Sequence, residues 1–216
     1  MNRRAVLLAL GGTTVGAAGC LTGDPSGWDD EDGETPDDPP PPEGSVRAAF
    51  EEGVTRPECE IESETVEADI GEETRSFETA GTTPYPDPPS EFDAGSITAF
   101  VESFEEAYVT QDVLCDRTSE NHILGVGYNV ETSETFDWHE DVTTAFLLRA
   151  AGASSGLDRD GRLWEADLPV DGVVYAVDET GTARADFGEA GTLEEDEFES
   201  EAPDPLEAGD LVARFD

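Results

Sequence analysis

The stretch "ITAFVESFEEAY", residues 97–108, decides the fold of this 216-residue chain. Its apolar side chains recur at intervals of three and four, which places them on one face of a helix. The members of this face are Ile97, Phe100, Val101, Phe104 and Tyr108. Three acidic residues are expected largely on the other faces: Glu102, Glu105 and Glu106. Asp93 is the expected N-cap, because its carboxylate can accept from the first free N–H groups. We therefore predict a helix whose apolar stripe packs in a core.

After this helix the apolar residues repeat every second position, which is the period of a strand. Short apolar or alternating segments predict strands at 122–130, 142–148, 163–168, 173–177, 182–187 and 211–215. Turn-like sequences stand at 158–161, 170–172 and 178–181. Connections of hairpin length favour antiparallel pairing, since parallel strands need long crossovers. The predicted fold class is α+β, with one main amphipathic helix packed on a mostly antiparallel sheet of five or six strands.

The segments around these elements give weaker patterns. Residues 46–54 predict a short helix, and residues 59–70 and 74–80 predict two strands joined by a turn at Gly71. Residues 192–205, "TLEEDEFESEAPDP", are expected to form an acidic loop before the last strand. We assign residues 45–216 to a single α+β domain.

The composition is strongly acidic. Asp and Glu number 53, the 11 basic residues are all Arg, and the formal net charge is −42. Such a surface repels phosphate backbones, so nucleic-acid binding lacks its usual electrostatic attraction. Dense carboxylates instead fit a medium of high salt, where screening shortens their mutual repulsion to a few ångströms.

The first twenty residues, "MNRRAVLLALGGTTVGAAGC", predict an export signal. Arg3 and Arg4 form a positive head, and the apolar run after them is too short to span a bilayer, which needs about 20 apolar residues. Small residues at 17–19 then precede Cys20. The order of charge, apolar run and small residues before a cysteine is typical of a cleaved signal peptide at 1–19.

The paired arginines resemble a twin-arginine signal, and residues 17–20 resemble a lipobox, although Ala17 stands where Leu or Val is commoner. Together with the acidic, lysine-free remainder, the chain resembles lipoproteins of halophilic archaea. The resemblance implies that Cys20 becomes the first residue of the mature chain and carries a lipid. It also implies that the protein is held by that lipid on the outer face of the cytoplasmic membrane, with the membrane as a partner.

A tether is expected at 20–44, between the anchor and the domain. Among residues 21–44, nine are acidic, six are proline and none is basic. A segment of this composition cannot bury a core, so it predicts an extended, disordered linker.

Three cysteines are present. If Cys20 is lipidated, Cys59 and Cys115 are left as a pair, and an extracytoplasmic setting favours a disulfide between them. Two buried free thiols are the alternative.

Several sequences resemble catalytic or metal-binding motifs without completing them. "GASSG" at 152–156 matches a nucleophile elbow with Ser154, but a turn follows it and no later histidine exists, so a flexible loop is expected. "LDRDGRLWEAD" at 157–167 lacks the first and last ligands of a calcium loop and predicts a hairpin turn. His122 and His139 have no metal-ligand spacing, and a turn is expected around residues 138–141. We therefore assign no catalytic residue, no metal ligand and no cofactor.

The leading functional hypothesis is a non-enzymatic envelope module that binds a small ligand or a protein partner. The first alternative is a surface hydrolase that uses clustered carboxylates or a metal, and it requires converging carboxylates beside His122 or His139. The second alternative is a purely structural envelope module.

Overall fold

The computed structural model describes residues 40–115 and 121–215. The predicted signal peptide at 1–19, with Arg3, Arg4 and Cys20, lies outside these residues, as does most of the tether at 20–44. The helices of the described part are η1 (Arg47–Ala49), α1 (Ala94–Cys115), η2 (Ala190–Thr192), η3 (Glu195–Glu197), α2 (Phe198–Glu201) and α3 (Pro205–Ala208). Its strands are β1 (Thr65–Ile70), β2 (Glu73–Glu78), β3 (His122–Phe136), β4 (Thr143–Leu157), β5 (Leu163–Glu165), β6 (Val170–Asp178), β7 (Gly181–Phe187) and β8 (Asp210–Arg214).

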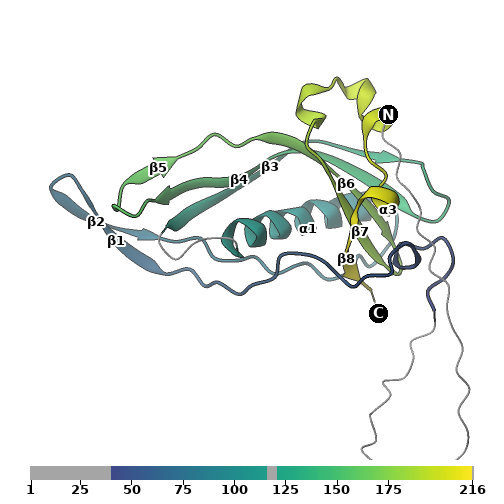
Figure 1. Cartoon of the computed structure of the whole chain (residues 1–216), viewed down its shortest axis with the longest axis horizontal. Helices are drawn as coiled ribbons and strands as arrows, with labels where there is room; N and C mark the ends of the chain where they lie inside the picture. Colours follow the sequence, from purple (N-terminus) through teal and green to yellow (C-terminus); the bar gives the residue numbers. More distant parts are fainter. Residues whose placement is uncertain (1–39, 116–120, 216) are drawn as a thin grey trace, which may run out of the picture. The chain divides into compact units, whose positions relative to one another are not determined.

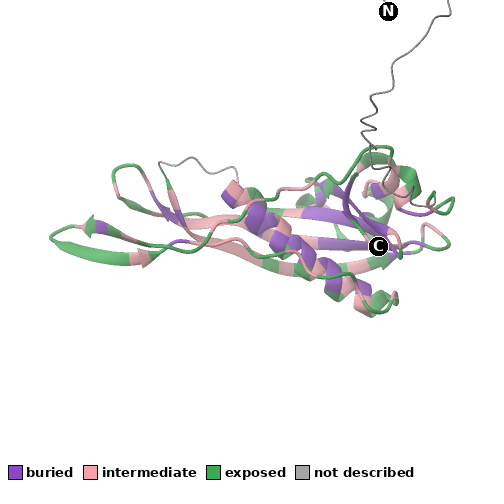
Figure 2. Cartoon of the chain, turned by 90° about the horizontal axis from the view of Figure 1, so that it is seen from below, coloured by how far each residue is buried: buried purple, intermediate pink, exposed green. Residues whose placement is uncertain are grey.

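Helix α1 confirms the prediction from its apolar stripe. The Asp93 carboxylate accepts from the backbone N–H groups of Gly95 and Ser96, at 3.0 and 3.2 Å, so Asp93 caps the helix as expected. The first four residues of the stripe are buried and pack against residues of the sheet, and Figure 2 shows buried residues along α1. The helix thus forms one layer of the domain.

The sheet confirms the predicted α+β class. The main sheet has six antiparallel strands: five follow the order β3-β4-β6-β7-β8, and the sixth, the short β5, pairs with β4. Strands β1 and β2 form a separate two-stranded hairpin, which is largely exposed (Figure 2). Because every pairing is between antiparallel neighbours, the long α1 is not a crossover and is free to cover one face of the sheet (Figure 1).

Both faces of the sheet are covered. The α1 face contains a core of Phe100, Phe104, Leu147 and Tyr175 with their neighbours. The opposite face packs Phe146 and Phe187 against the fully buried Phe198 of α2. The C-terminal helical segment therefore supplies a third layer.

Several local predictions are wrong. Residues 192–205 are not a plain loop, because the burial of Phe198 folds them into short helices on the sheet. The first strand starts at Thr65 and not at residue 59. "GASSG" at 152–156 and "VDG" at 170–172 lie within β4 and β6, where pairing with neighbouring strands overrides the turn tendency of small residues. Glu105, which was expected on an outer face of α1, is buried.

The cysteine pair is bonded. The Sγ atoms of Cys59 and Cys115 form a disulfide, with their Cα atoms 5.8 Å apart. Beside it, the side-chain oxygen of Gln111 accepts from the N–H of Cys59 at 2.9 Å, and its amide donates to the carbonyl of Thr83 at 3.1 Å. The disulfide and this glutamine fix the segments before α1 to the last turns of the helix.

Candidate functional site

A cluster of charged side chains is buried between α1 and the sheet. Glu105 is fully buried at its centre, although the sequence pattern placed it on an outer face of the helix. Residue 105 lies eight positions after Ile97 and four after Val101, which is two turns and one turn of helix, so it belongs to the inward stripe. A glutamate on a helix usually faces solvent, and the local spacing does not show the distant partners that allow this one to be buried.

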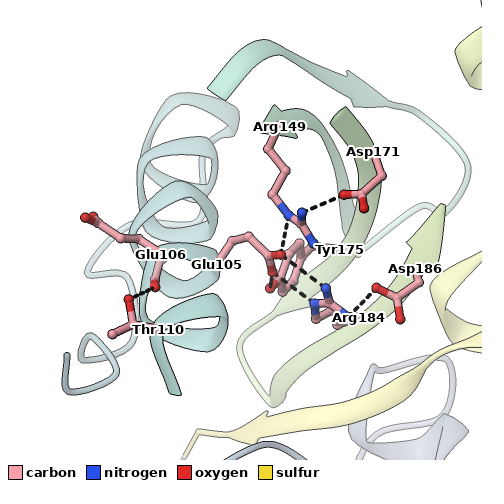
Figure 3. Close-up of polar contacts among 8 residues, drawn as sticks. All are labelled: Glu105, Glu106, Thr110, Arg149, Asp171, Tyr175, Arg184 and Asp186. Carbon is pink, nitrogen blue, oxygen red and sulfur yellow. Dashed lines mark hydrogen bonds and ion pairs between the residues drawn. The ribbon is translucent and has the colours of Figure 1, made fainter. Parts of the chain in front are cut away.

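Each oxygen of the Glu105 carboxylate has two donors (Figure 3). Arg149 donates from Nε to Oε1 at 2.5 Å. Arg184 donates from Nε to Oε2 at 2.9 Å and from a terminal nitrogen to Oε1 at 3.1 Å. The hydroxyl of Tyr175 donates to Oε2 at 2.5 Å. A carboxylate has about four lone-pair positions, so this one is saturated.

Two outer carboxylates extend the cluster toward solvent. Asp171 accepts from Arg149 at 2.6 Å, and Asp186 pairs with Arg184 at 2.8 Å (Figure 3). The guanidinium of Arg184 also lies over the ring of Tyr108, 4.1 Å from its centre. Each buried guanidinium thus has a carboxylate on both its inner and its outer side.

The surroundings fix the protonation states of the cluster. Burial disfavours the ionised form of Glu105, but the charges of Arg184 and Arg149 and the hydrogen bonds outweigh it and lower the pKa below its ordinary value of 4.5. Burial and the adjacent Glu105 carboxylate raise the pKa of Tyr175 well above its ordinary range. Glu105 is therefore a carboxylate and Tyr175 a neutral phenol at neutral pH.

This cluster stabilises the fold, and its carboxylate is not available to act as a base or to bind a ligand. Glu105 has no lone pair left to accept a proton from a substrate, and its lowered pKa makes it a poor base. A buried carboxylate with every acceptor position filled does, however, fix the relative position of α1, β4, β6 and β7. We assign the cluster a structural role.

The hydroxyl group of the nearby Tyr128 is less well hydrogen-bonded than that of Tyr175. Its hydroxyl oxygen is buried and has no hydrogen-bond partner among the described residues. Burial and the Glu105 carboxylate raise the pKa of Tyr128, so its phenol stays protonated. It lies on β3 opposite Ala151, on the α1 face of the sheet.

An open hollow of about 780 Å³ lies at the other end of the sheet, beside the connection from β3 to β4. Its lining includes two aromatic residues, Phe92 and Trp138, together with His139, Asp141 and Glu179. The turn predicted at residues 138–141 forms the hollow's wall, and Trp138 also packs on Phe136 with ring centres 5.0 Å apart. The hollow combines apolar rings with carboxylates and has the volume of a small-ligand site.

Two titratable residues of this hollow, His139 and Asp178, have separate partners. Nε2 of His139 lies 3.2 Å from the carboxylate of Asp204. Asp178 accepts from the N–H groups of Val46, Thr180 and Gly181. Within residues 40–115 and 121–215, no three His, Cys, Asp or Glu side chains are grouped closely enough to hold a metal ion. The combination of aromatic rings and carboxylates in the hollow suits the binding of a ligand.

The other motifs considered in the sequence are structural in this fold. The Asp158 carboxylate accepts from the N–H groups of Asp160 and Arg162, which closes the turn between β4 and β5 as predicted. Ser154 lies within β4, and His122 opens β3 opposite Leu157. His122 is the first residue of β3 and His139 lies three residues after the strand's other end, so the structure does not bring the two histidines together.

Sequence reasoning missed the buried cluster. Arg184 lies within the predicted strand 182–187, and Arg149 directly follows the predicted strand 142–148. Each arginine continues the alternation of an inward face: Ala145, Leu147 and Arg149 on β4, and Thr182 and Arg184 on β7. An arginine at an inward position of a strand, together with a glutamate at an inward position of a helix, was the available signal.

No helix of the described residues is long and apolar enough to cross a membrane. Comparison of the chain with protein-family models, with curated proteins and with solved structures gives no match.

Proposed function

We propose that this chain is a non-enzymatic, ligand-binding module of a halophile, held by a lipid on Cys20 at the outer face of the cytoplasmic membrane. The anchor rests on the order of features in residues 1–20: Arg3 and Arg4, the short apolar run, and small residues before Cys20. The halophilic setting rests on the 53 acidic residues set against 11 arginines.

The observation that carries the binding role is the hollow beside Trp138. Its volume of about 780 Å³ lies in the range of small-molecule sites, about 300–1,000 Å³. Acidic groups occur over the whole surface of this protein and do not mark a site, but two half-buried aromatic rings in one hollow do. Phe92 and Trp138 offer apolar area on which a ligand can rest.

The lining favours a ligand with a positive charge. A cation over an aromatic face gains electrostatic attraction, about 0.5–2 kcal/mol according to its desolvation. Asp141 and Glu179 line the same hollow and would add to that attraction. An anionic ligand would meet these carboxylates unfavourably. We therefore expect organic cations, such as quaternary ammonium compounds or guanidinium-bearing molecules.

The binding role is tested by tryptophan fluorescence. In a background of Trp28→Phe and Trp164→Phe, Trp138 is the remaining indole. Titration with tetramethylammonium or arginine amide in 2 M KCl should change its emission saturably, because the ligand displaces water from the ring. Acetate should give no saturable change. Phe92→Ala should weaken cation binding at least threefold, whereas Phe77→Ala on the distant β2 should not. A linear response to every cation would contradict the proposal.

The anchor is tested by fractionation. In a haloarchaeal host, the natural chain should sediment with membranes, because its lipid inserts in the bilayer. Cys20→Ser should release the chain into the soluble fraction, and Thr22→Ser serves as the matched control. Membrane retention of the Cys20→Ser chain, once its signal segment is shown to be cleaved, would contradict a lipid on that cysteine.

A further inference from the structure

Strand β3 has an open outer edge. It is an outer strand of the six-stranded sheet and pairs with β4 on its inner side. At its beginning, the carbonyl of Ile123 accepts from the N–H of Ala80 at 2.9 Å. From Gly125 to Phe136, no backbone hydrogen bond reaches the outer side from any residue that the structure describes. A long edge of this kind offers N–H and C=O groups to another strand.

The hydrogen bonds of β4 show which main-chain N–H and C=O groups of β3 point outward. Ala151 donates from its N–H to the carbonyl of Pro169, just before β6, so its main-chain groups point away from β3. Main-chain groups alternate in direction along a strand, so those of Leu147 and Ala145 point the same way. Their partners on β3, Ser133 and Thr135, must therefore turn their N–H and C=O groups outward.

This part of the edge is regular and accessible. The register shifts of β3 lie before Thr132, whereas Thr132–Phe136 pairs with β4 in unbroken register. The side chains of Ser133 and Thr135 are exposed. Between them and the first turns of α1 lies a shallow hollow of about 460 Å³, lined by Ala94, Gly95 and Thr98. The small residues on the helix leave space for an added backbone.

The open edge marks the site, and the carboxylates along this groove favour a basic over an acidic incoming strand. Glu131 and Glu134 belong to β3, and Asp93 caps the adjacent end of α1. Glu102 comes four residues, about one helical turn, after Thr98 and so lies on the same side of α1 as Thr98. An added strand with basic side chains would neutralise these carboxylates.

We propose that the outer edge of β3 at Thr132–Phe136 docks an extended, basic segment of a partner protein, which adds to the sheet as its next strand. This surface goes beyond the proposed ligand hollow and is separate from its lining. A second copy of this chain fits poorly, because antiparallel self-pairing would set the glutamates of one β3 against those of the other. Residues 21–44 fit poorly as well, with nine acids, six prolines and no base.

A labelled ten-residue peptide of alternating arginine and valine tests the proposal by fluorescence anisotropy with the full chain. In 2 M KCl the Debye length falls below about 3 Å, so non-specific attraction to the acidic surface is suppressed. We expect saturable binding of this peptide, and at least tenfold weaker binding when its alternate amides are N-methylated. A peptide of alternating glutamate and valine should not bind.

Variants of the chain locate the site. Ser133→Pro removes one outward N–H and should weaken binding at least tenfold, while Ser133→Ala should leave it unchanged. Glu134→Lys should weaken binding at least threefold, and Glu195→Lys, with the same change of charge on η3, should not. If Ser133→Pro does not fold, hydrogen exchange decides: the N–H groups of Ser133 and Thr135 should exchange at least tenfold more slowly with peptide bound.

Three results would overturn the proposal. A folded Ser133→Pro chain that binds the peptide normally would exclude pairing at this edge. Equal losses for Glu134→Lys and Glu195→Lys would show attraction to the general surface charge. Light scattering that shows chain dimers which Ser133→Pro abolishes would assign the edge to self-association. Because Phe92 lies outside this groove, loss of cation binding in Phe92→Ala with peptide binding intact separates this test from that of the ligand hollow.

Discussion

The two faces of the central sheet are both buried, but by different chemistry. Under α1, an apolar core surrounds Glu105, Arg149, Arg184 and Tyr175, which satisfy one another's charges and hydrogen bonds. On the other face, the cluster around Phe146, Phe187 and Phe198 consists of apolar side chains. The polar face depends on every partner being present, because an uncompensated buried charge costs far more than a missing apolar contact. The comparison predicts which face is more sensitive to change.

The largest effect is expected from Glu105→Ala. It leaves two guanidiniums buried with no inner carboxylate, and breaking a buried ion pair costs about 3–5 kcal/mol of unfolding free energy. Urea denaturation in molar KCl measures this. The change of all three charged residues at once, Glu105→Leu with Arg149→Met and Arg184→Met, should recover most of the loss. A single Glu105→Ala that costs less than about 1 kcal/mol would show that water replaces the lost carboxylate.

A smaller loss is expected from Phe198→Ala on the apolar face. The deletion removes a fully buried ring from a helix of four residues, and such truncations cost about 3 kcal/mol or more where the cavity cannot collapse. Because α2 lies at the edge of the fold, we expect partial collapse and a loss of about 3 kcal/mol, below that of Glu105→Ala. Thermal unfolding with Phe198→Leu as the control measures it. An equal or larger loss than for Glu105→Ala would reverse the ranking of the faces.

The smallest and most specific effect is a dependence on pH. Since folding lowers the pKa of Glu105 below its ordinary 4.5, the stability it contributes is present above that value and is lost as the pH falls through the folded pKa. The difference in unfolding free energy between the natural chain and Glu105→Gln should therefore shrink between pH 6 and pH 3.5. The other carboxylates are common to both chains and cancel in this difference. Phe198→Ala should show no such trend. A constant difference across the range for Glu105→Gln would contradict the ionised carboxylate.

The fold could be predicted from the sequence but the buried cluster could not, and the reason is physical. The stripe from Ile97 to Tyr108 and the alternation after His122 report which side chains avoid water, and this is enough for a helix on an antiparallel sheet. Asp93 as the N-cap follows from local hydrogen bonding. The burial of Glu105 follows the same spacing, but a charge is buried only if its partners are present. Those partners are 44 and 79 residues away in the sequence.

Residues 152–156 and 170–172 also show that distant partners can override what a local sequence predicts. Their glycines favour turns when each segment is considered alone, yet both lie in strands that have neighbours on both sides or along much of their length. Ladder hydrogen bonds and packing outweigh a weak local preference. The edge of β3 is another feature of this kind, since no local sequence says which strand of a sheet will be outermost.

The sequence by itself determined the helix, the antiparallel strands, the capping aspartate and the cysteines available to pair, because each depends on local spacing or on chemical type. It also supplies, on residues 1–20, the basis for the proposed export and anchoring. The tertiary structure alone decided that Glu105 is enclosed by Arg149, Arg184 and Tyr175, that Trp138 and Phe92 share a hollow, and that β3 keeps an open edge. These features join distant segments, and their free energies arise only when the layers meet.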